Sequence, residues 1–184
     1  MLVKEETVRF LGQISFHLSF IGRFIEALDN AYDAVSLSRS LVAEDPGYTP
    51  QLANQLGSLG TSLSNLNRHT DALNPAQESV TLYRSLIADN PRSYSPELAD
   101  QLGTLGGFFS NVNRHTEALN VTQESVTLYR SLVADNPQSH TPNLALELGN
   151  LGLRLLGLKR HTEALNATQE SITLYRSLVA DNPW

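Results

Sequence analysis

The stretch that decides the fold is NRHTEALNVTQESVTLYRSLVADNP, at residues 113–137. It returns at 159–183 as KRHTEALNATQESITLYRSLVADNP, with three positions changed. A third copy occupies 67–91, and a diverged copy, GRFIEALDNAYDAVSLSRSLVAEDP, occupies 22–46. Self-similarity at a fixed period of this kind is typical of stacked supersecondary units, and it argues against a single globular core.

The copies end at prolines that lie 45 or 46 residues apart: Pro46, Pro91, Pro137 and Pro183. A constant spacing of this length indicates that the same unit is built again and again along the chain. We therefore expect one repeat domain over 1–184, made of repeats at about 1–46, 47–91, 92–137 and 138–184.

Each repeat is predicted to contain two helices. In the second repeat, Leu56, Leu59 and Leu63 follow the three-and-four spacing of a helix, with no strand-like alternation. A hydroxyl residue followed by proline is a favourable helix start, and such a pair opens the first helix of three repeats: Thr49-Pro50, Ser95-Pro96 and Thr141-Pro142. The pattern predicts eight helices, near 4–20, 24–43, 50–66, 70–89, 96–112, 116–135, 142–158 and 162–181.

Short polar turns are predicted between the two helices of each repeat, near 21–23, 67–69, 113–115 and 159–161. We expect Thr70 to cap the second helix of the second repeat. At the other end of that helix, Asn90 is expected to adopt the left-handed conformation that stops a helix, and Pro91 prevents its continuation.

Paired glycines recur in the first helices, as LGSLG at 56–60, LGTLG at 102–106 and LGNLG at 148–152. A phosphate-binding glycine loop follows a strand and is completed by a Lys and a Ser or Thr, and neither feature is present here. Glycine inside a helix costs about 1 kcal/mol relative to alanine, so its repeated use needs a compensating contact. We therefore expect the glycines to pack helices closely, each admitting a Leu or Tyr from a neighbouring helix.

The repeats resemble the tetratricopeptide repeat. Its signature is a Leu-Gly pair in the first helix, an Ala at the start of the second helix, a small or aromatic residue one turn later and a closing Pro. In the third repeat these are Leu105-Gly106, Ala118, Thr122 and Pro137. The first repeat departs from the signature, with Ile14-Ser15 in place of Leu-Gly. The long period, and openings such as SPELA at 95–99, are similar to the long-repeat variant of kinesin light chains.

This resemblance implies an all-α, right-handed solenoid of four helix-turn-helix repeats, whose first helices line a concave groove that binds a peptide. Helical phase places the following residues on the wall of that groove: Arg9, Phe16, Phe20, Asn54, Thr61, Asn65, Asp100, Gly107, Asn111, Leu146 and Leu153. The ranges 50–66 and 96–112 contain no Lys or Arg, so a groove specialised for a chaperone's C-terminal carboxylate is not expected. The expected groove is neutral and lined by amides in its middle, with apolar ends.

Composition and charge disfavour several other classes of function. The formal net charge of −6 argues against a nucleic-acid or anionic-membrane surface. The absence of cysteine removes thiolate chemistry. No stretch approaches the roughly 20 apolar residues of a membrane span, and the beginning of the chain lacks a signal-peptide pattern, so we expect a cytoplasmic protein. No catalytic constellation emerges, so we expect neither an enzyme nor a cofactor.

Three further ladders recur once per repeat. His69, His115 and His161 stand at the predicted turns, at least ~8–10 Å apart if the helices stack side by side, so they are not expected to share a metal. Acidic and basic residues form the other two ladders and are interpreted as solvated or inter-repeat ion pairs: Glu78, Glu124 and Glu170, with Arg84, Arg130 and Arg176.

Two functional hypotheses follow. The first is a protein–protein interaction scaffold that binds a peptide segment of a partner in the groove. The alternative is a self-associating repeat region, or a sensor or spacer within a larger polypeptide. Helix 162–181 keeps the interior pattern although no further repeat follows, so we expect a self-association surface, most simply a two-fold homodimer, at Ile172, Tyr175, Val179 and Trp184. A continuation of the natural polypeptide beyond Trp184 would cover the same surface.

Overall fold

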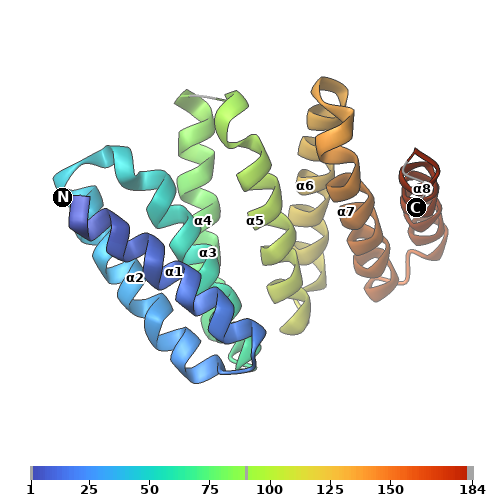
Figure 1. Cartoon of the computed structure of the whole chain (residues 1–184). Coiled ribbons are helices and arrows are strands. Elements are labelled where there is room, and N and C mark those ends of the chain that lie inside the picture. The colour runs from blue at the N-terminus through green and yellow to red at the C-terminus, as the bar shows by residue number, and fades with distance from the viewer. Residues whose placement is uncertain (1, 90, 182–184) are drawn as a thin grey trace. The chain divides into compact units, whose positions relative to one another are not determined.

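The computed structural model describes residues 2–89 and 91–181 (Figure 1). This part of the chain contains eight α-helices, one short 3-10 helix and no strand, which confirms the all-α repeat solenoid. The chain divides into two compact units, unit 1 over residues 1–91 and unit 2 over 92–184. The right-handed twist and the continuity of one domain over 1–184 stay predictions.

The helices follow one another as hairpins, as the repeats predict. The elements of unit 1 are α1 (Leu2–Phe20), α2 (Phe24–Glu44), the 3-10 helix η1 (Pro46–Tyr48), α3 (Thr49–Asn65) and α4 (His69–Asp89). Those of unit 2 are α5 (Pro91–Asn111), α6 (His115–Asp135), α7 (Pro137–Gly157) and α8 (His161–Asp181). Each odd-numbered helix is the first helix of its repeat, and each even-numbered helix is the second.

Within each unit the second helix of one repeat packs against the first helix of the next, α2 on α3 and α6 on α7, and side chains also join the like helices of the two repeats. In unit 1 the amide of Gln55 on α3 packs against Gly12 of α1, and in unit 2 the carboxyl group of Glu147 on α7 packs against Gly103 of α5. Ion pairs join the second helices: Arg39 on α2 with Glu78 on α4 (2.6 Å), and Arg130 on α6 with Glu170 on α8 (2.8 Å). The Arg130–Glu170 contact joins two residues of the predicted ladders, whereas Arg39 was not among the predicted basic residues.

The starts of the first helices differ from the prediction. Thr49 is the first residue of α3 and not its cap, since its hydroxyl donates to the Pro46 carbonyl (2.7 Å). α5 and α7 begin at Pro91 and Pro137, so that Pro96 and Pro142 lie inside them. The prediction that Ser95-Pro96 and Thr141-Pro142 start these helices was therefore wrong.

The physical reason is visible at α7. Asn136 precedes the helix, and its side-chain oxygen accepts a hydrogen bond from the Ser139 amide (3.4 Å), while Pro137 takes the first helical position. An Asn cap followed by proline is itself a favourable helix start, and it lies upstream of the expected one. In the second repeat Gly47 follows Pro46, and this stretch forms η1 before α3 begins.

In each hairpin, the first helix ends at a turn that contains a residue in the left-handed region of backbone conformation. The φ angles of these residues are +80° for Gly22, +58° for Asn67, +61° for Asn113 and +59° for Lys159. Asn90, which was predicted to stop α4 in this conformation, lies outside the described residues. Its counterpart Asn136 has a φ of −145° and is extended, so the left-handed stop is not used at the end of α6.

The cap predicted at Thr70 was also wrong, because α4 begins at His69 and Thr70 lies inside the helix. At the start of α6, the residue in the cap position is Arg114, and it makes no side-chain cap hydrogen bond. Its guanidinium instead pairs with Glu117 in the first turn (2.7 Å), where a carboxylate also interacts favourably with the helix N-terminus.

The second glycine of each pair in unit 2 lies in mid-helix and packs against the second helix of its own repeat. A Cβ on Gly106 of α5 would lie 2.5 Å from Thr122 Oγ and 3.4 Å from the Ala118 carbonyl oxygen, both on α6. A Cβ on Gly152 would meet Thr168 Oγ at the same 2.5 Å. The neighbour that the glycine admits is thus a threonine and a backbone carbonyl, and not the Leu or Tyr that we expected.

The first repeat lacks this glycine and forms the same helix contact with different residues. Ser15 takes the place of Gly106, and its hydroxyl donates to the carbonyl of Ala27 (2.7 Å). The position that corresponds to Thr122 is Ala31, which is buried. In the third repeat the larger residue of this contact is Thr122 on the second helix, whereas in the first repeat it is Ser15 on the first helix. Both helix pairs therefore keep their close packing.

Candidate interaction surfaces

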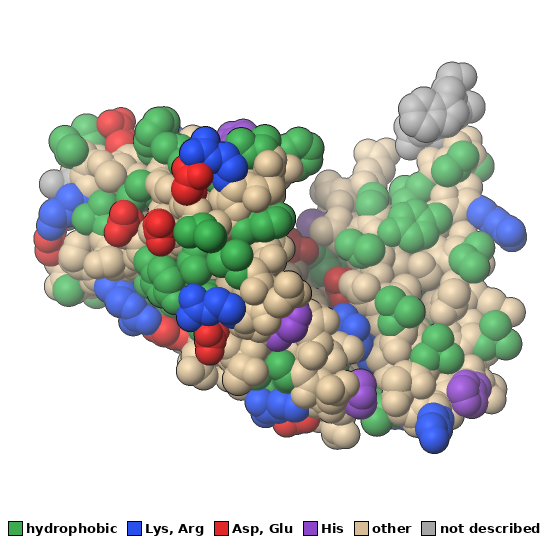
Figure 2. All heavy atoms as spheres, turned by 90° about the horizontal axis from the view of Figure 1, so that it is seen from below, with side chains coloured by type: hydrophobic (Ala, Val, Ile, Leu, Met, Phe, Trp, Pro, Cys, Tyr) green, Lys and Arg blue, Asp and Glu red, His purple; other side chains and the backbone are tan. Residues whose placement is uncertain are grey.

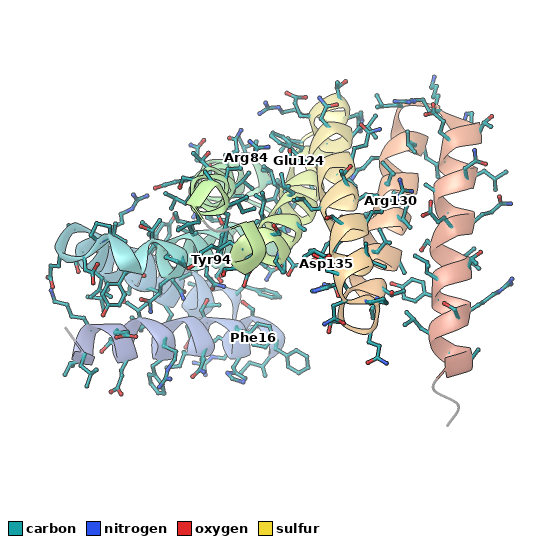
Figure 3. All side chains as sticks on the ribbon, turned by 90° about the horizontal axis from the view of Figure 1, so that it is seen from above. Phe16, Arg84, Tyr94, Glu124, Arg130 and Asp135 are labelled. Atoms are coloured by element: carbon teal, nitrogen blue, oxygen red, sulfur yellow. The ribbon has the colours of Figure 1, made fainter. Side chains whose placement is uncertain are left out.

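The predicted groove wall is exposed throughout. Phe16 and Phe20 on α1 are 70% and 84% exposed, and Phe16 points away from its helix (Figure 3). Leu146 and Leu153 on α7 are 56% and 60% exposed. The remaining predicted side chains are exposed as well: Arg9, Asn54, Thr61, Asn65, Asp100 and Asn111. Each of these ten side chains is accessible to a ligand, and their role in binding stays a prediction.

Apolar side chains are not spread evenly over the surface. Hydrophobic side chains gather in one broad patch on unit 1, whereas those on unit 2 are more scattered (Figure 2). At the end of the α1–α2 hairpin, Phe20, Ile21 and Ile25 are all more than half exposed, at 84%, 63% and 69%. Exposed apolar groups gathered in one place are typical of an interaction surface.

A buried phenol anchors one wall residue of unit 2. Tyr129 on α6 is 1% exposed, its hydroxyl donates to the Asp100 carboxylate on α5, and it accepts from the Asn143 amide on α7 (3.1 Å). Burial raises the pKa of Tyr129 well above its usual value, and the hydrogen bond to Asp100 is the second cause of this increase. The phenol therefore stays protonated and holds three helices of unit 2 together at the wall.

Glu147 is a buried acid beside this cluster. It is 7% exposed, and its Oε1 accepts from the Asn150 amide (3.0 Å), whereas Oε2 has no hydrogen-bond partner among the described residues. Burial raises the pKa of Glu147, and the negative charge of Asp100 adds to this effect. The corresponding residues of the second and third repeats are the neutral Gln55 and Gln101.

Arg154 is a charged wall residue that was not predicted from the sequence. It lies on α7, and burial lowers its pKa, while the nearby Glu147 carboxylate opposes that effect. Its guanidinium would come within 3.8 Å of a Cβ on Gly107, a predicted wall residue. The middle of the wall in unit 2 is therefore not purely neutral, because it holds a carboxyl group and a guanidinium. The sequence signal from which it could have been predicted was the position of Arg154 in the last turn of the helix expected at 142–158.

Unpartnered polar atoms concentrate on the first helices. Eight buried side-chain oxygen or nitrogen atoms have no hydrogen-bond partner within the described residues, and six of them lie on α3, α5 and α7. The six atoms belong to Gln51, Gln55, Glu97, Gln101, Glu147 and Arg154. Buried polar groups are usually satisfied, so within each unit these atoms distinguish the first helices from the second helices.

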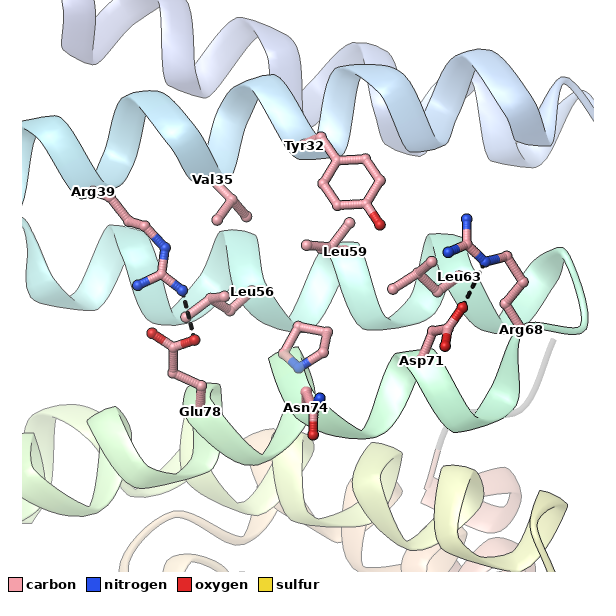
Figure 4. A pocket seen from close by; sticks show the side chains of 11 residues that line it. Tyr32, Val35, Arg39, Leu56, Leu59, Leu63, Arg68, Asp71, Asn74 and Glu78 are labelled. Carbon is pink, nitrogen blue, oxygen red and sulfur yellow. Dashed lines mark hydrogen bonds and ion pairs between the residues drawn. The ribbon is translucent and has the colours of Figure 1, made fainter.

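Unit 1 also has a hollow between α2 and α4 (Figure 4). It has a volume of about 500 Å³, and three leucines of α3 form its floor: Leu56, Leu59 and Leu63. The ion pairs Arg39–Glu78 and Arg68–Asp71 flank it. This hollow was not predicted from the sequence, because it depends on side chains from three helices.

The predicted self-association residues on α8 are exposed as far as the structure describes them. Ile172, Tyr175 and Val179 are 44%, 42% and 62% exposed, and Leu165 on the same helix is 57% exposed. Trp184, the fourth predicted residue, lies outside the described residues. The role of this surface in association stays a prediction.

The turn histidines take part in local contacts. His69 Nδ1 lies 3.2 Å from the Ser64 hydroxyl in a hydrogen bond, and the ring of His115 packs against Gly157. Among the described residues, no group of three or more His, Asp or Glu side chains is arranged to hold a metal ion. None of the described helices is long and apolar enough to cross a membrane.

Residues 52–92 match the tetratricopeptide repeat family, and this match indicates no enzyme family. No curated protein matches the sequence of the chain. The fold is similar to the crystal structure of BtubC (BKLC) from P. vanneervenii, with a TM-score of 0.79 and 15% identity, over 96% of this chain and 65% of that one.

Two further solved structures are similar in fold. The apo form of RapI has a TM-score of 0.77 and 13% identity, over 94% of this chain and 57% of that one. Aspartyl phosphate phosphatase F from Bacillus subtilis has a TM-score of 0.75 and 13% identity, over 97% of this chain and 42% of that one. The chain thus spans less than two thirds of the length of each of these three proteins. At such identities the likeness concerns the fold alone.

Proposed function

We propose, from the premise that this chain is a repeat protein of the tetratricopeptide type, that it is an interaction scaffold that binds an extended segment of another protein. In each unit, taken by itself, the binding surface is its pair of first helices, α1 and α3 in unit 1 and α5 and α7 in unit 2. The observation that carries the proposal is that all ten predicted wall side chains on the first helices are exposed, amides together with large apolar groups.

The exposed amides on the first helices suit the backbone of an extended peptide. Such a peptide carries an amide donor and a carbonyl acceptor at every residue, and both need partners when the peptide is removed from water. The amide of an asparagine side chain offers both an acceptor and a donor. The exposed amides of Asn54 and Asn65 in unit 1, and of Asn111 in unit 2, extend the same chemistry along the wall.

The exposed apolar residues supply the contacts for side chains of the bound segment. Phe16 and Phe20 stand at one part of the wall in unit 1, and Leu146 and Leu153 stand on α7 in unit 2. Successive residues of an extended peptide alternate between two sides, so apolar residues at every second position would meet such groups while the backbone meets the amides. We therefore expect a partner segment with alternating apolar residues.

A peptide library displayed on phage and selected against the full chain tests this proposal. Peptides recovered on the wild-type chain should bind the Leu146→Asp/Leu153→Asp variant at least about tenfold more weakly, because an apolar contact is replaced by charge. Asn65→Ala and Asn111→Ala should weaken binding less. The matched control is Gln123→Ala, an exposed position on the second helix α6.

Circular dichroism would establish that each variant remains helical. Unchanged affinity across the three wall variants, with loss of binding in the control, would contradict the proposal and move the site to the second helices. Loss of binding in Tyr32→Ser alone would assign it instead to the hollow between α2 and α4. The alternative hypothesis of self-association concerns the surface of α8 and not this wall.

A further inference from the structure

The exposed side of α8 carries the same residues that inner repeats bury. Leu119 and Tyr129 on α6 are 4% and 1% exposed, whereas their counterparts Leu165 and Tyr175 on α8 are 57% and 42% exposed. Val126 is 3% exposed and its counterpart Ile172 is 44% exposed. On α6, Val126 and Tyr129 are covered by Leu144 and Leu148 of the next first helix, α7. No described helix covers the corresponding side of α8.

We propose that this side of α8, together with Gly149 of α7, binds the α1–α2 hairpin of a second copy of the chain, in the register by which successive repeats stack. The contact is head-to-tail, with a different surface used on each copy. It replaces the two-fold homodimer expected from the sequence. Three features of the two surfaces carry the proposal: a residue that fills a glycine, an ion pair and an apolar face.

The first feature is the glycine and the residue that fills it. Gln55 of the second repeat packs on Gly12 of the first, with its Oε1 2.8 Å from where a Cβ would lie, and Glu147 packs on Gly103 at 2.5 Å. Gly149 is the glycine of the fourth repeat, and a Cβ there would meet only the Ser171 hydroxyl of its own repeat, at 3.5 Å.

The residue that corresponds to Gln55 and Glu147 in the first repeat is Phe10. It is 63% exposed, whereas Gln55 and Glu147 are each 7% exposed. In a head-to-tail pair, Phe10 of one copy would therefore lie over Gly149 of the other and bury an aromatic ring. A two-fold pairing of α8 with α8 gives Phe10 no role.

The second feature is charge. In each unit an arginine of one second helix pairs with the acid of the next, as Arg39 with Glu78 and Arg130 with Glu170. The arginine of the last repeat is Arg176, exposed on α8, and the acid of the first repeat is Asp33, exposed on α2. The same register that places Phe10 over Gly149 brings Arg176 of one copy to Asp33 of the other.

The third feature is the apolar face of α1. Leu11 corresponds to Leu148, which covers α6 in unit 2, and Val3 is 77% exposed near the start of the helix. The match is not complete, because Thr7 stands where the fourth repeat has Leu144. We therefore expect an association weaker than the stacking of repeats within the chain, and dependent on protein concentration.

Sedimentation velocity of the full chain, from low micromolar to several hundred micromolar, tests the proposal. The weight-average mass should rise about twofold or more with concentration and should not stop at the dimer, because head-to-tail contacts do not close. Arg176→Asp alone and Asp33→Arg alone should each abolish this rise. The matched control, Asn120→Asp on the exposed side of α6, should leave it unchanged.

A mixture of the Arg176→Asp and Asp33→Arg variants gives the sharpest result. The carboxylate introduced on α8 of the first variant then meets the guanidinium introduced on α2 of the second. The native Arg176 of the second variant likewise meets the native Asp33 of the first, so the mixture should associate although neither variant does so alone.

Two outcomes would overturn the proposal. One is a chain that stays monomeric at every concentration. The other is a dimer that is insensitive to Asp33→Arg, which would favour the two-fold arrangement through α8. Neither outcome affects peptide binding on the first helices, which these variants do not touch.

Discussion

α6 and α8 have almost the same sequence and different surroundings. Three positions differ between 113–137 and 159–183, and both stretches form a helix of 21 residues. Yet α6 buries Leu119 and Tyr129, whereas α8 leaves Leu165 and Tyr175 about half exposed. The difference lies in the neighbour, since α6 is followed by α7 and no described helix follows α8.

This comparison separates what the local sequence determines from what stacking determines. The helix forms in both copies, because the residues that specify it are nearly the same. Burial of the apolar stripe, which supplies most of the stability of a helix in a protein, is present only where a next repeat packs against it. In a repeat array, stability is accordingly a sum of repeat and interface contributions.

The largest expected difference is between the two tyrosines. Tyr129→Ala should lower the free energy of unfolding by about 3 kcal/mol or more, as for other large aromatic residues removed from a core. It also removes the hydrogen bonds to Asp100 and Asn143. Tyr175→Ala, at the corresponding position of α8, should cost less than about 1 kcal/mol at low protein concentration. Urea unfolding of both variants, followed by circular dichroism, measures this. Equal losses would mean that α8 is covered.

The glycines give the next largest difference. Gly106→Leu should lower the free energy of unfolding by roughly 1–3 kcal/mol, because the added side chain meets Thr122 and a backbone carbonyl. Gly149→Ala should instead be neutral or raise it by up to about 1 kcal/mol, since its Cβ has ordinary contact distance and alanine favours the helix. Thermal unfolding of the two variants would show opposite shifts in Tm. A loss of stability in Gly149→Ala would show that the glycine is already covered.

Glu147 gives a smaller difference, which depends on pH. Its pKa is raised in the folded chain, so the folded state holds the proton more tightly than the unfolded state does. The contribution of Glu147 to the free energy of unfolding is complete below the ordinary glutamate pKa of 4.5. It is lost as the pH rises through the raised pKa of the folded state. Glu147→Gln should therefore raise the free energy of unfolding by about 1 kcal/mol at pH 7.

The same variant should have little effect in acid, where Glu147 is protonated in both states. Urea unfolding at several pH values checks this, with Glu6→Gln on the exposed surface of α1 as the control. A gain in stability at Glu147→Gln that is the same at every pH would contradict the interpretation of Glu147 as a buried acid.

The ion pairs between second helices give the smallest expected effect. Arg130 and Glu170 are both about half exposed, and exposed ion pairs contribute about 0.2–1 kcal/mol. Arg130→Ala should lower the Tm slightly at low salt and not at all at high salt. Arg176→Ala should have no effect at low protein concentration. A large effect of Arg176→Ala on a dilute sample would indicate a partner for Arg176 within the same chain.

The repeats made the hairpins and their turns predictable, because each copy repeats the same local pattern. The start of α7 was not predictable in the same way, since Asn136-Pro137 and Thr141-Pro142 are both favourable starts and the chain uses the first. The left-handed Lys159 was not predicted either. It stands where the second and third repeats have Asn67 and Asn113, so the geometry of the turn overrides the preference of the residue.

The candidate wall was predictable only as far as helical phase determines exposure. All ten predicted side chains are exposed, because the phase of one helix is sufficient to place them. The cluster of Asp100, Tyr129 and Asn143 comes from three different helices, and its hydrogen bonds depend on how these helices pack. The unpartnered polar atoms on the first helices were missed for the same reason.

Hydrogen exchange of the two nearly identical helices, followed by mass spectrometry, tests the central comparison most directly. Residues 116–133 and 162–179 have nearly the same intrinsic exchange rates, because their sequences differ at only two positions. In dilute protein, the amides of α6 should exchange more slowly than those of α8, since only α6 is covered on both sides. At high concentration the protection of α8 should rise toward that of α6. Equal protection of the two helices in dilute protein would contradict the account.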